Sequence, residues 1–300
     1  MKNPKITVLM PVYNAKKFLN EAIDSILNQT FKNFEFLIIN DASTDNSKQI
    51  ILSYRDSRII YYENKINLGV AKTLNIGLAL TTSKYIARMD ADDISVQNRL
   101  EKQVEFMEKN PQVAVCGTWL KLINNENNDI WQSPSDHKTI KSLSLFYSSL
   151  YHPTVLIRND VLKRYHLSYN SSFKHVEDYE LWVRIMENAR VANLKEVLLF
   201  HRIHSNHVGT VYNHIQVKNA NRVRIYQLNK LGIFPNPEEL AVHQAISYWQ
   251  FKPHKKFVKD AKLWLKKLFI ANFKKNYYDQ LGFLKVLTGK WFLIWKIKHY

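Results

Sequence analysis

The sequence predicts an α/β fold, in which a mostly parallel sheet is covered by helices on both faces, followed by an all-helical C-terminal extension. Strand-like and helix-like segments alternate through residues 6–107, and only helical patterns occur from about residue 213 onward. Such alternation produces parallel strands joined by crossover helices. The chain has 300 residues, of which 46% are apolar, so it has ample material for a buried core.

The elements can be predicted in order along the chain. Four strand and helix pairs are expected first: strands 6–10, 34–40, 59–62 and 85–89, with helices 18–27, 46–54, 70–80 and 96–107. The middle is less regular, with strands expected at 113–122, 154–158 and 197–202, and helices around Val161 and at 178–188. Pro235 and Pro237 separate helices in the remainder. We therefore expect a catalytic domain at 1–212 and a basic, aromatic-rich helical extension at 213–300.

The amino-acid composition limits which partners and which cellular compartment we expect. The formal charge of +17 favours polyanionic partners, meaning nucleic acid, anionic lipid or phosphorylated substrates, and the last fifty residues hold only Asp260 and Asp279 against many lysines. A single cysteine, Cys116, excludes an internal disulfide and indicates a reducing compartment. No apolar run approaches the roughly 18 residues that span a bilayer, and residues 1–5 do not resemble a signal peptide. We expect a cytoplasmic protein.

Polar residues follow several predicted strands, and an acidic cluster follows the fourth. Ligands bind at the carboxyl ends of strands in open α/β sheets, so these loops are expected to share one edge. Asp90, Asp92 and Asp93 come directly after an apolar run, and residues i and i+2 of an extended segment point the same way. Clustered carboxylates suit Mg²⁺ or Mn²⁺ bridged to a diphosphate. The alternative is a solvated acidic turn that caps the next helix.

Several segments together resemble the family 2 glycosyltransferases with the GT-A fold. The resemblance covers roughly residues 5–210 and is carried by segments 7–14, 38–45, 67–77, Asp90-Ala91-Asp92 and 177–184. It implies a Rossmann-like mixed sheet flanked by helices, and an inverting, nucleotide-sugar dependent enzyme of bacterial surface-glycan synthesis. One departure is Leu74, where many members carry arginine.

The resemblance assigns the donor side of the site. It implies that Asp41 accepts the imide N–H of uracil, although an ordinary turn residue is the alternative reading. Asp92 is the expected ligand of the Mn²⁺ or Mg²⁺ cofactor, and Asp93 is expected to organise the loop. The nucleotide-sugar-binding residues expected from the matching loops are Pro11, Val12, Tyr13, Asn14, Asp41, Asn67, Lys72, Arg88, Asp90 and Arg202.

The acceptor side is expected to come from the second half of the chain. Inverting transfer needs a carboxylate to take the proton of the acceptor hydroxyl, and the matching family motif assigns this role to Asp178. Glu177 is then expected to bind sugar or acceptor. The alternative is that Asp178 is the N-cap of a helix, and both readings are compatible. His152 either shapes the acceptor side or is a structural hydrogen-bonding group.

The segment 198–206 resembles the strand and loop that close the nucleotide site. We expect Arg202 to meet the diphosphate and His204 to bind the metal. His201, His204 and His207 also raise the possibility of a zinc site, but no cysteine lies nearby and the upstream oxygen ligands favour a harder ion.

The tail contains an amphipathic basic helix. Phe257, Ala261, Trp264, Leu265 and Leu268 have helical spacing, and lysines occupy the other faces. One hypothesis is attachment to an anionic membrane surface, on the cytoplasmic face of the inner membrane, which would bring the enzyme to a lipid-linked glycan acceptor. The alternative is a helical subdomain whose apolar stripe packs internally.

The function expected from the sequence is therefore metal-dependent transfer of a sugar from a nucleoside diphosphate donor to a glycan. The expected donor is a UDP-hexose or UDP-N-acetylhexosamine, and the expected acceptor is a hydroxyl of lipopolysaccharide, capsule or another cell-surface glycan. The alternatives are a nucleotidyl- or phospho-transferring enzyme on the same scaffold, and a basic nucleic-acid-binding protein. No recognised nucleic-acid motif appears, so no specific nucleic acid is expected as a partner.

Overall fold

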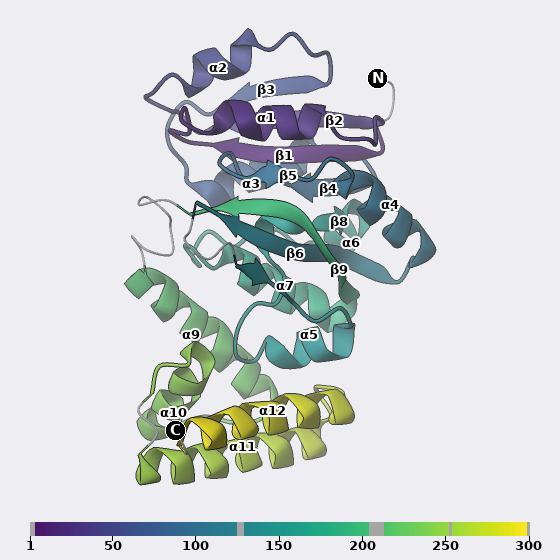
Figure 1. Ribbon diagram of the computed structural model, residues 1–300. Coiled ribbons are helices and arrows are strands. Elements are labelled where there is room, and N and C mark those ends of the chain that lie inside the picture. Colours follow the sequence, from purple (N-terminus) through teal and green to yellow (C-terminus); the bar gives the residue numbers. More distant parts are fainter. Residues whose placement is uncertain (1–3, 125–128, 204–212, 252–253, 299–300) are drawn as a thin grey trace.

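The computed structural model describes residues 4–124, 129–203, 213–251 and 254–298. One curled mixed sheet is flanked by helices, and a helical layer follows at the C-terminal end (Figure 1). The strands are β1 (Ile6–Val12), β2 (Phe34–Asn40), β3 (Ile59–Glu63), β4 (Tyr85–Arg88), β5 (Ile94–Ser95), β6 (Val113–Ile123), β7 (Ile130–Trp131), β8 (Leu156–Arg158) and β9 (Arg190–Arg202).

The helices of the sheet-containing part are α1 (Leu19–Leu27), α2 (Ser47–Ser53), α3 (Val70–Leu80), α4 (Arg99–Lys109), α5 (His137–Leu143), the 3₁₀ helix η1 (His152–Thr154), α6 (Asn159–Arg164) and α7 (Glu177–Asn188). The C-terminal helices are α9 (Asn213–Lys230), α10 (Pro237–Tyr248), α11 (Lys255–Lys275) and α12 (Gln280–Lys298). The predicted α/β fold with an all-helical extension is therefore confirmed.

The described strands form one sheet in the order β3-β2-β1-β4-β8-β6-β9-β5, with β7 paired to β6 beside this path. Strands β3, β2, β1 and β4 are parallel, whereas β8 is antiparallel to both β4 and β6. The register pairs Val12 with Asn40 and Leu9 with Arg88. The loops that follow β1, β2 and β4 therefore leave the sheet at the same edge.

Helices cover both faces of the sheet because its strands bury apolar side chains on both sides. In β1, Val8 and Met10 pack in a cluster with residues of α1 and α4, whereas Leu9 packs in a second cluster with residues of α3 and α7. Successive side chains of a strand point to opposite faces, so one strand serves both clusters. This near-continuous apolar pattern is typical of a sheet that is buried on both faces.

The C-terminal helices have a third apolar cluster of their own. It joins α9, α10, α11 and α12 to Leu145 and Phe146, which follow α5. Buried polar contacts reinforce this junction, because Gln227 Nε2 donates to the Ser144 carbonyl at 2.7 Å and His243 Nε2 lies 3.1 Å from the Leu145 carbonyl oxygen. The division at residues 212 and 213 stays a prediction.

The predicted apolar stripe of the basic helix is internal. Phe257, Ala261, Trp264, Leu265 and Leu268 are all buried on α11 within the third cluster. The structure therefore bears out the packing alternative for this stripe, and these side chains are not exposed for insertion into lipid. Within the described residues, no helix combines the length and the apolar run needed to span a bilayer.

Several expected boundaries were wrong by a few residues. The helix expected from residue 96 begins at Arg99, because β5 and a turn come first. The helix expected to begin after an Asp178 cap begins at Glu177 with Val176 as its N-cap, so Asp178 lies inside the first turn. The last strand of the middle region is longer than expected, since β9 already begins at Arg190.

Candidate active site

The loops after β1 and β2 are joined by side-chain to backbone hydrogen bonds. Asn14 Oδ1 accepts from the Thr44 N–H at 2.8 Å, and the Asn14 N–H donates to Ser43 Oγ at 3.0 Å. Asn14 has a φ of 51°, a left-handed conformation that asparagine tolerates better than most residues. These contacts hold Tyr13, which is 51% exposed, on the open side of the loop.

Asp41 lies under the same edge and organises the next loop. Its Oδ1 accepts from Asn64 Nδ2 at 2.7 Å and from the Leu68 N–H at 2.9 Å, and its Oδ2 accepts from the Gly69 N–H at 2.9 Å. Gly69 has a φ of 81°, which favours glycine at this position. A carboxylate has about four lone-pair sites, so three bonds leave one for a ligand donor. The contact with uracil stays a prediction.

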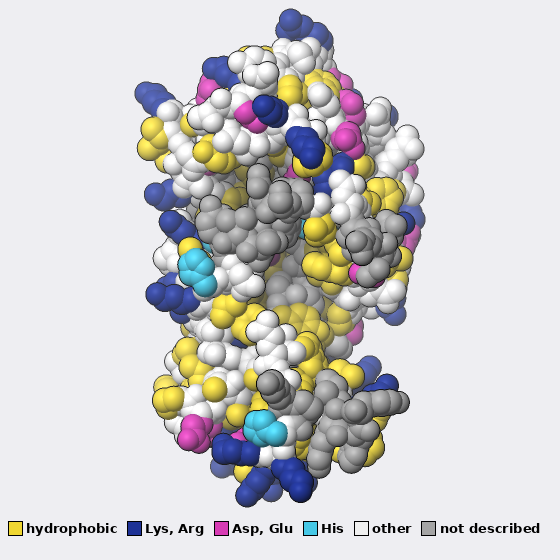
Figure 2. Space-filling model, turned by 60° about the vertical axis from the view of Figure 1, so that its left-hand side comes forward, with side chains coloured by type: hydrophobic (Ala, Val, Ile, Leu, Met, Phe, Trp, Pro, Cys, Tyr) yellow, Lys and Arg dark blue, Asp and Glu magenta, His cyan; other side chains and the backbone are white. Residues whose placement is uncertain are grey.

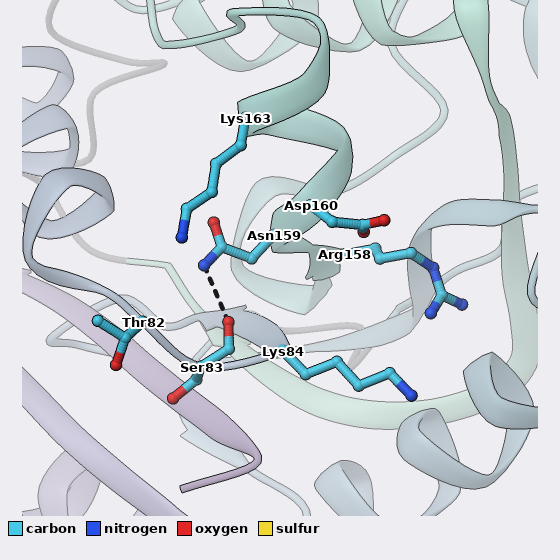
Figure 3. Close-up of a pocket in the computed structure, with 7 residues that line it drawn as sticks. All are labelled: Thr82, Ser83, Lys84, Arg158, Asn159, Asp160 and Lys163. Atoms are coloured by element: carbon cyan, nitrogen blue, oxygen red, sulfur yellow. Dashed lines mark hydrogen bonds between the residues drawn. The ribbon is translucent and has the colours of Figure 1, made fainter. Parts of the chain in front are cut away.

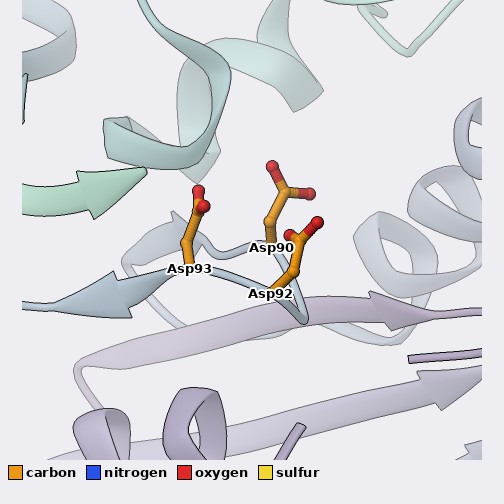
Figure 4. A group of neighbouring side chains, drawn as sticks. All are labelled: Asp90, Asp92 and Asp93. Atoms are coloured by element: carbon orange, nitrogen blue, oxygen red, sulfur yellow. The ribbon is translucent and has the colours of Figure 1, made fainter. Parts of the chain in front are cut away.

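The acidic residues after β4 form a cluster. Figure 4 shows the side chains of Asp90, Asp92 and Asp93 projecting to the same side of their loop, and one carboxylate oxygen from each lies within 4.8 Å of the others. Asp90 and Asp92 are partly exposed, whereas Asp93 is fully buried. Three oxygen donors this close fit a hard divalent cation such as Mn²⁺ or Mg²⁺.

Asp93 connects the acidic loop to the end of β9. Its Oδ1 lies 2.9 Å from His201 Nδ1 and accepts from the Arg202 N–H at 3.0 Å. Burial lowers the pKa of His201, but the hydrogen bond and charge of Asp93 outweigh it and raise this pKa above its usual value. Asp93 is therefore a loop-organising residue, as predicted, and its oxygens are already used by β9.

Arg202 stabilises the backbone of the acidic loop. Its Nε donates to the Asp92 carbonyl at 2.9 Å, its Nη2 donates to Glu21 at 2.8 Å, and its guanidinium lies 4.4 Å from the centre of the Phe18 ring. The side chain is only 6% exposed. The guanidinium thus fixes the backbone of the acidic loop, and its predicted contact with a diphosphate stays a prediction. His204, the predicted second metal ligand, lies outside the described residues, as does His207.

Arg88 is a buried cation between the acidic residues of the two halves of the chain. It ends β4, is 5% exposed and forms an ion pair with Asp90, while its Nε has no hydrogen-bond partner among the described residues. Its positive charge also acts on Glu177 and Asp178. The structure places this cation inside the protein beside carboxylates, and its predicted contact with the nucleotide sugar stays a prediction.

Helix α7 brings Glu177 and Asp178 to the acidic loop. Burial raises the pKa of Asp178 above its ordinary value, while the Tyr179 backbone N–H and the charge of Arg88 oppose the rise and the charge of Asp90 adds to it. Burial and the neighbouring Asp178 likewise raise the pKa of Glu177. Glu177 Oε2 is buried with no hydrogen-bond partner among the described residues. An orphaned buried carboxylate oxygen is costly, so Glu177 is a candidate for contact with a ligand, and its predicted role in binding sugar or acceptor stays a prediction.

His152 and Tyr169 lie next to each other beside Glu177 and Asp178. His152 Nε2 lies 2.9 Å from Tyr169 Oη, and the His152 ring contacts the Trp182 ring edge-on at 5.9 Å. Burial and the charge of Arg88 lower the pKa of His152 well below its usual value, so the ring is neutral. The structure gives His152 a structural hydrogen bond, and its predicted role in shaping the acceptor side stays a prediction.

Sequence reasoning missed the residue that positions Tyr169. Asn75 of α3 donates from Nδ2 to the Tyr169 carbonyl at 2.8 Å and accepts from the Tyr169 N–H at 2.9 Å. Asn75 lies in the segment 67–77 that carried the resemblance, so a signal was present. Tyr169 lies 94 residues away in an irregular loop, and no local pattern pointed to it.

The remaining predicted residues of the donor side differ in exposure. Asn67 and Lys72 are exposed at this edge, and Pro11 is partly exposed. Val12 is buried in the core, and its carbonyl accepts from the Asp41 N–H at 2.8 Å, so its side chain is not available to a ligand. Any contribution of Val12 to nucleotide binding is therefore indirect.

A hollow of about 220 Å³ lies at the amino-terminal end of β4, the end opposite the acidic loop. Figure 3 shows that its lining includes Ser83, Lys84 and Asn159, with Asn159 Nδ2 donating to the Ser83 carbonyl at 2.8 Å. Lys84 pairs with Glu108 at 2.9 Å. Asn159 thus joins the start of β4 to α6 and Lys84 joins it to α4, and none of the acidic residues after β4 lines this hollow.

The curled mixed sheet with the acidic loop at its edge has the GT-A fold. The family model described as "Glycosyl transferase family 2" matches residues 7–174, and an uncharacterized glycosyltransferase of Haemophilus influenzae is 37% identical over 246 residues, covering 77% of this chain and 76% of that protein. The chain belongs to glycosyltransferase family 2.

Two further comparisons extend this result. An Escherichia coli protein named UDP-Glc:alpha-D-GlcNAc-diphosphoundecaprenol beta-1,3-glucosyltransferase is 31% identical over 187 residues, covering 62% of this chain and 72% of that protein. The mannosyltransferase PcManGT from Pyrobaculum calidifontis, solved with GDP-Man and Mn²⁺, has the same fold with a TM-score of 0.63 at 14% identity, covering 100% of this chain and 88% of that one.

Proposed function

We propose that this enzyme transfers a sugar, with inversion, from a UDP-hexose or UDP-N-acetylhexosamine to a hydroxyl of a lipid-linked cell-surface glycan, as in lipopolysaccharide or capsule synthesis. The observation that carries the proposal is the convergence of two carboxylates of raised pKa, the buried Glu177 and the partly exposed Asp178, on the acidic loop that follows β4. The donor and acceptor are supported by the Escherichia coli relative, whose name includes UDP-glucose and a diphosphoundecaprenol-linked sugar.

Asp178 is the proposed base. As the acceptor oxygen attacks the anomeric carbon, its proton passes to Asp178, a new glycosidic bond forms, and the bond to the UDP oxygen breaks with its electron pair leaving on UDP. Burial raises the pKa of Asp178, and a carboxylate of raised pKa is a stronger base than an ordinary aspartate. A helix start is a rigid platform for such a group, since the first turn of α7 fixes its position.

Glu177 and the donor loops are proposed to position the substrates. Glu177 offers an unpaired buried oxygen that suits a hydroxyl donor of the sugar or acceptor. The loops of Tyr13 and Asp41 are proposed to receive the nucleoside, because both lie at the carboxyl ends of their strands. Asp90 is proposed to face the nucleotide sugar from the acidic loop.

A divalent cation, Mn²⁺ or Mg²⁺, is proposed to bind at Asp92. Asp90 and Asp92, the two partly exposed members of the carboxylate cluster, suit such an ion, and the mannosyltransferase of the same fold was solved in complex with Mn²⁺. Bound there, the ion would supply positive charge to the departing diphosphate.

The proposal is tested by incubating the purified enzyme with a panel of nucleotide sugars and MnCl₂ and measuring the released nucleotide. We expect UDP release from one or more UDP-sugars and its loss when EDTA is added. A nucleotidyl-transferring enzyme would instead release pyrophosphate. Release of pyrophosphate, or equal turnover of UDP-, GDP- and CMP-sugars, would contradict the proposed donor class.

A further inference from the structure

The outer face of α11 combines exposed lysines with exposed apolar side chains. Leu263, Ile270 and Phe273 are 56%, 42% and 70% exposed, and they lie on the helix face opposite the buried stripe. The same face carries Lys259 and Lys266, both exposed, at spacings of three and four residues from Leu263. The whole helix holds eight lysines and one aspartate.

Internal ion pairs do not neutralise this face. No acidic side chain within residues 4–124, 129–203, 213–251 and 254–298 forms an ion pair with Lys259, Lys266 or Lys274. By contrast, Lys256 pairs with Asp260 and Lys267 with Glu239. The positive charge on the face is therefore available to an external partner.

A hollow of about 460 Å³ lies beside this face. Leu231 and Ile233 from the turn after α9, together with Leu263 and Ile270, give it an apolar lining. Lysines also line it: Lys266, Lys267, Lys274 and Lys275. Figure 2 shows lysine or arginine side chains with hydrophobic ones among them at the lower end of the molecule, where Figure 1 places α11.

We propose that the outer face of α11, with its adjoining hollow, docks on an anionic lipid bilayer. Interfacial helices combine lysines, which meet acidic headgroups, with large apolar side chains, which enter the boundary of the acyl region. A second copy of the chain fits less well, since two such faces would bring like charges together. Nucleic acid would leave Leu263, Ile270 and Phe273 against a phosphate backbone.

This inference deepens the proposed function, since a lipid-linked acceptor would be reached from a bilayer surface, and it rests on that proposal for its biological meaning. The lipid binding itself does not depend on sugar transfer. The docking proposal and the proposed function can therefore fail separately. A protein that binds vesicles but releases no UDP would support the docking face and contradict the proposed donor.

The full chain is tested by flotation with vesicles of 70% phosphatidylcholine and 30% phosphatidylglycerol, and with vesicles of phosphatidylcholine alone. We expect binding to the anionic vesicles only, weakened by salt. Each lysine near such a surface contributes about a factor of five in affinity, so removing three should weaken binding about 100-fold. The test variant is K259Q/K266Q/K274Q, and the control with the same charge change is K32Q/K163Q/K195Q, whose lysines are exposed elsewhere.

The apolar contribution has its own matched pair. L263S/F273S removes two exposed side chains of the face, whereas L52S/L80S removes two that are 46% and 49% exposed on the sheet-containing part. We expect only the first to weaken vesicle binding, by at least about tenfold. Absence of binding by the unmodified chain, or equal losses in test and control variants, would overturn the inference. Binding of an acidic soluble protein to the outer face of α11, with no binding to vesicles, would also overturn the inference.

Discussion

Replacement of Arg88 by glutamine tests the electrostatic design of the site. Arg88 is 5% exposed, pairs with Asp90, and is the nearby positive charge that opposes burial in setting the pKa values of Glu177 and Asp178. Glutamine removes the charge and keeps much of the side-chain length. The pKa of the proposed base should therefore rise further above its ordinary value.

The expected size of the pKa shift follows from the loss of a neighbouring opposite charge. A neighbouring opposite charge lowers a carboxyl pKa by about 1 to 3 units, and one unit corresponds to about 1.4 kcal/mol. Since only the deprotonated base can accept the acceptor's proton, activity rises as pH passes this pKa. The acidic limb of kcat/KM should therefore move to higher pH by at least about one unit in Arg88→Gln. Arg88→Lys, which keeps the charge, should leave the limb near its original pH.

The assay is UDP release measured from pH 5 to pH 9, with thermal unfolding of each variant as a control for folding. At high pH, Arg88→Gln should recover most of the activity that it loses at neutral pH. A uniform loss at every pH, with an unmoved limb, would refute the reasoning, because it would mean that Arg88 supports the fold or binds substrate without tuning the base.

Three further predictions concern the metal, the carboxylates and the packing. Asp92→Asn should raise the MnCl₂ concentration for half-maximal activity at least about tenfold. The control Asp160→Asn, an exposed change on α6, should leave this concentration unchanged. Equal MnCl₂ titration curves for the two variants would contradict the role of Asp92 as a metal ligand. Asp178→Asn should raise the free energy of unfolding at pH 8 but not at pH 3. An acid whose pKa is raised in the folded state loses stability as pH rises above its ordinary value of 3.8, and a urea titration showing no gain at pH 8 would contradict this. Gly77→Ala would place a Cβ 2.3 Å from Leu9 Cδ1 and should lower the free energy of unfolding, measured in urea, by about 1–3 kcal/mol. Gly289→Ala, whose added Cβ would have nothing within 4 Å, should not destabilise the protein. An unchanged urea midpoint for Gly77→Ala would show that Leu9 moves freely.

The sheet-containing fold was predictable because its signals are local. Each of β1, β2 and β4 is an apolar run that ends in polar residues, and parallel strands send those ends to one edge. The order of the later strands was not predictable, since β6 and β9 pair across more than seventy residues and their register shifts between Val113 and Val115 and again between Thr118 and Leu120. Nothing in the local pattern specifies such a pairing.

The candidate site was predictable in its residues but less so in their surroundings. The acidic cluster and the Glu177-Asp178 pair are visible in the sequence, whereas the burial of Arg88 between them depends on which loops meet in space. The contact between Asn75 and Tyr169 likewise joins distant segments.

The amphipathic helix shows a different limit. Periodicity located both faces of α11, but it could not say that the stripe with Trp264 packs on α10 and α12 while the face with Phe273 is exposed. An apolar stripe looks the same in sequence whether it meets protein or lipid.

The proton transfer assigned to Asp178 is the central claim, and one comparison tests it most directly. Donor binding and transfer are measured for Asp178→Asn beside Glu180→Gln, which neutralises a carboxylate that pairs with Arg184 on the same helix. Removal of a general base costs about 10² to 10⁴ in rate. We predict that Asp178→Asn binds UDP-sugar within about threefold of the original enzyme while transfer falls by that factor, and that Glu180→Gln retains both. Transfer by Asp178→Asn at a rate near that of the original enzyme would contradict the account.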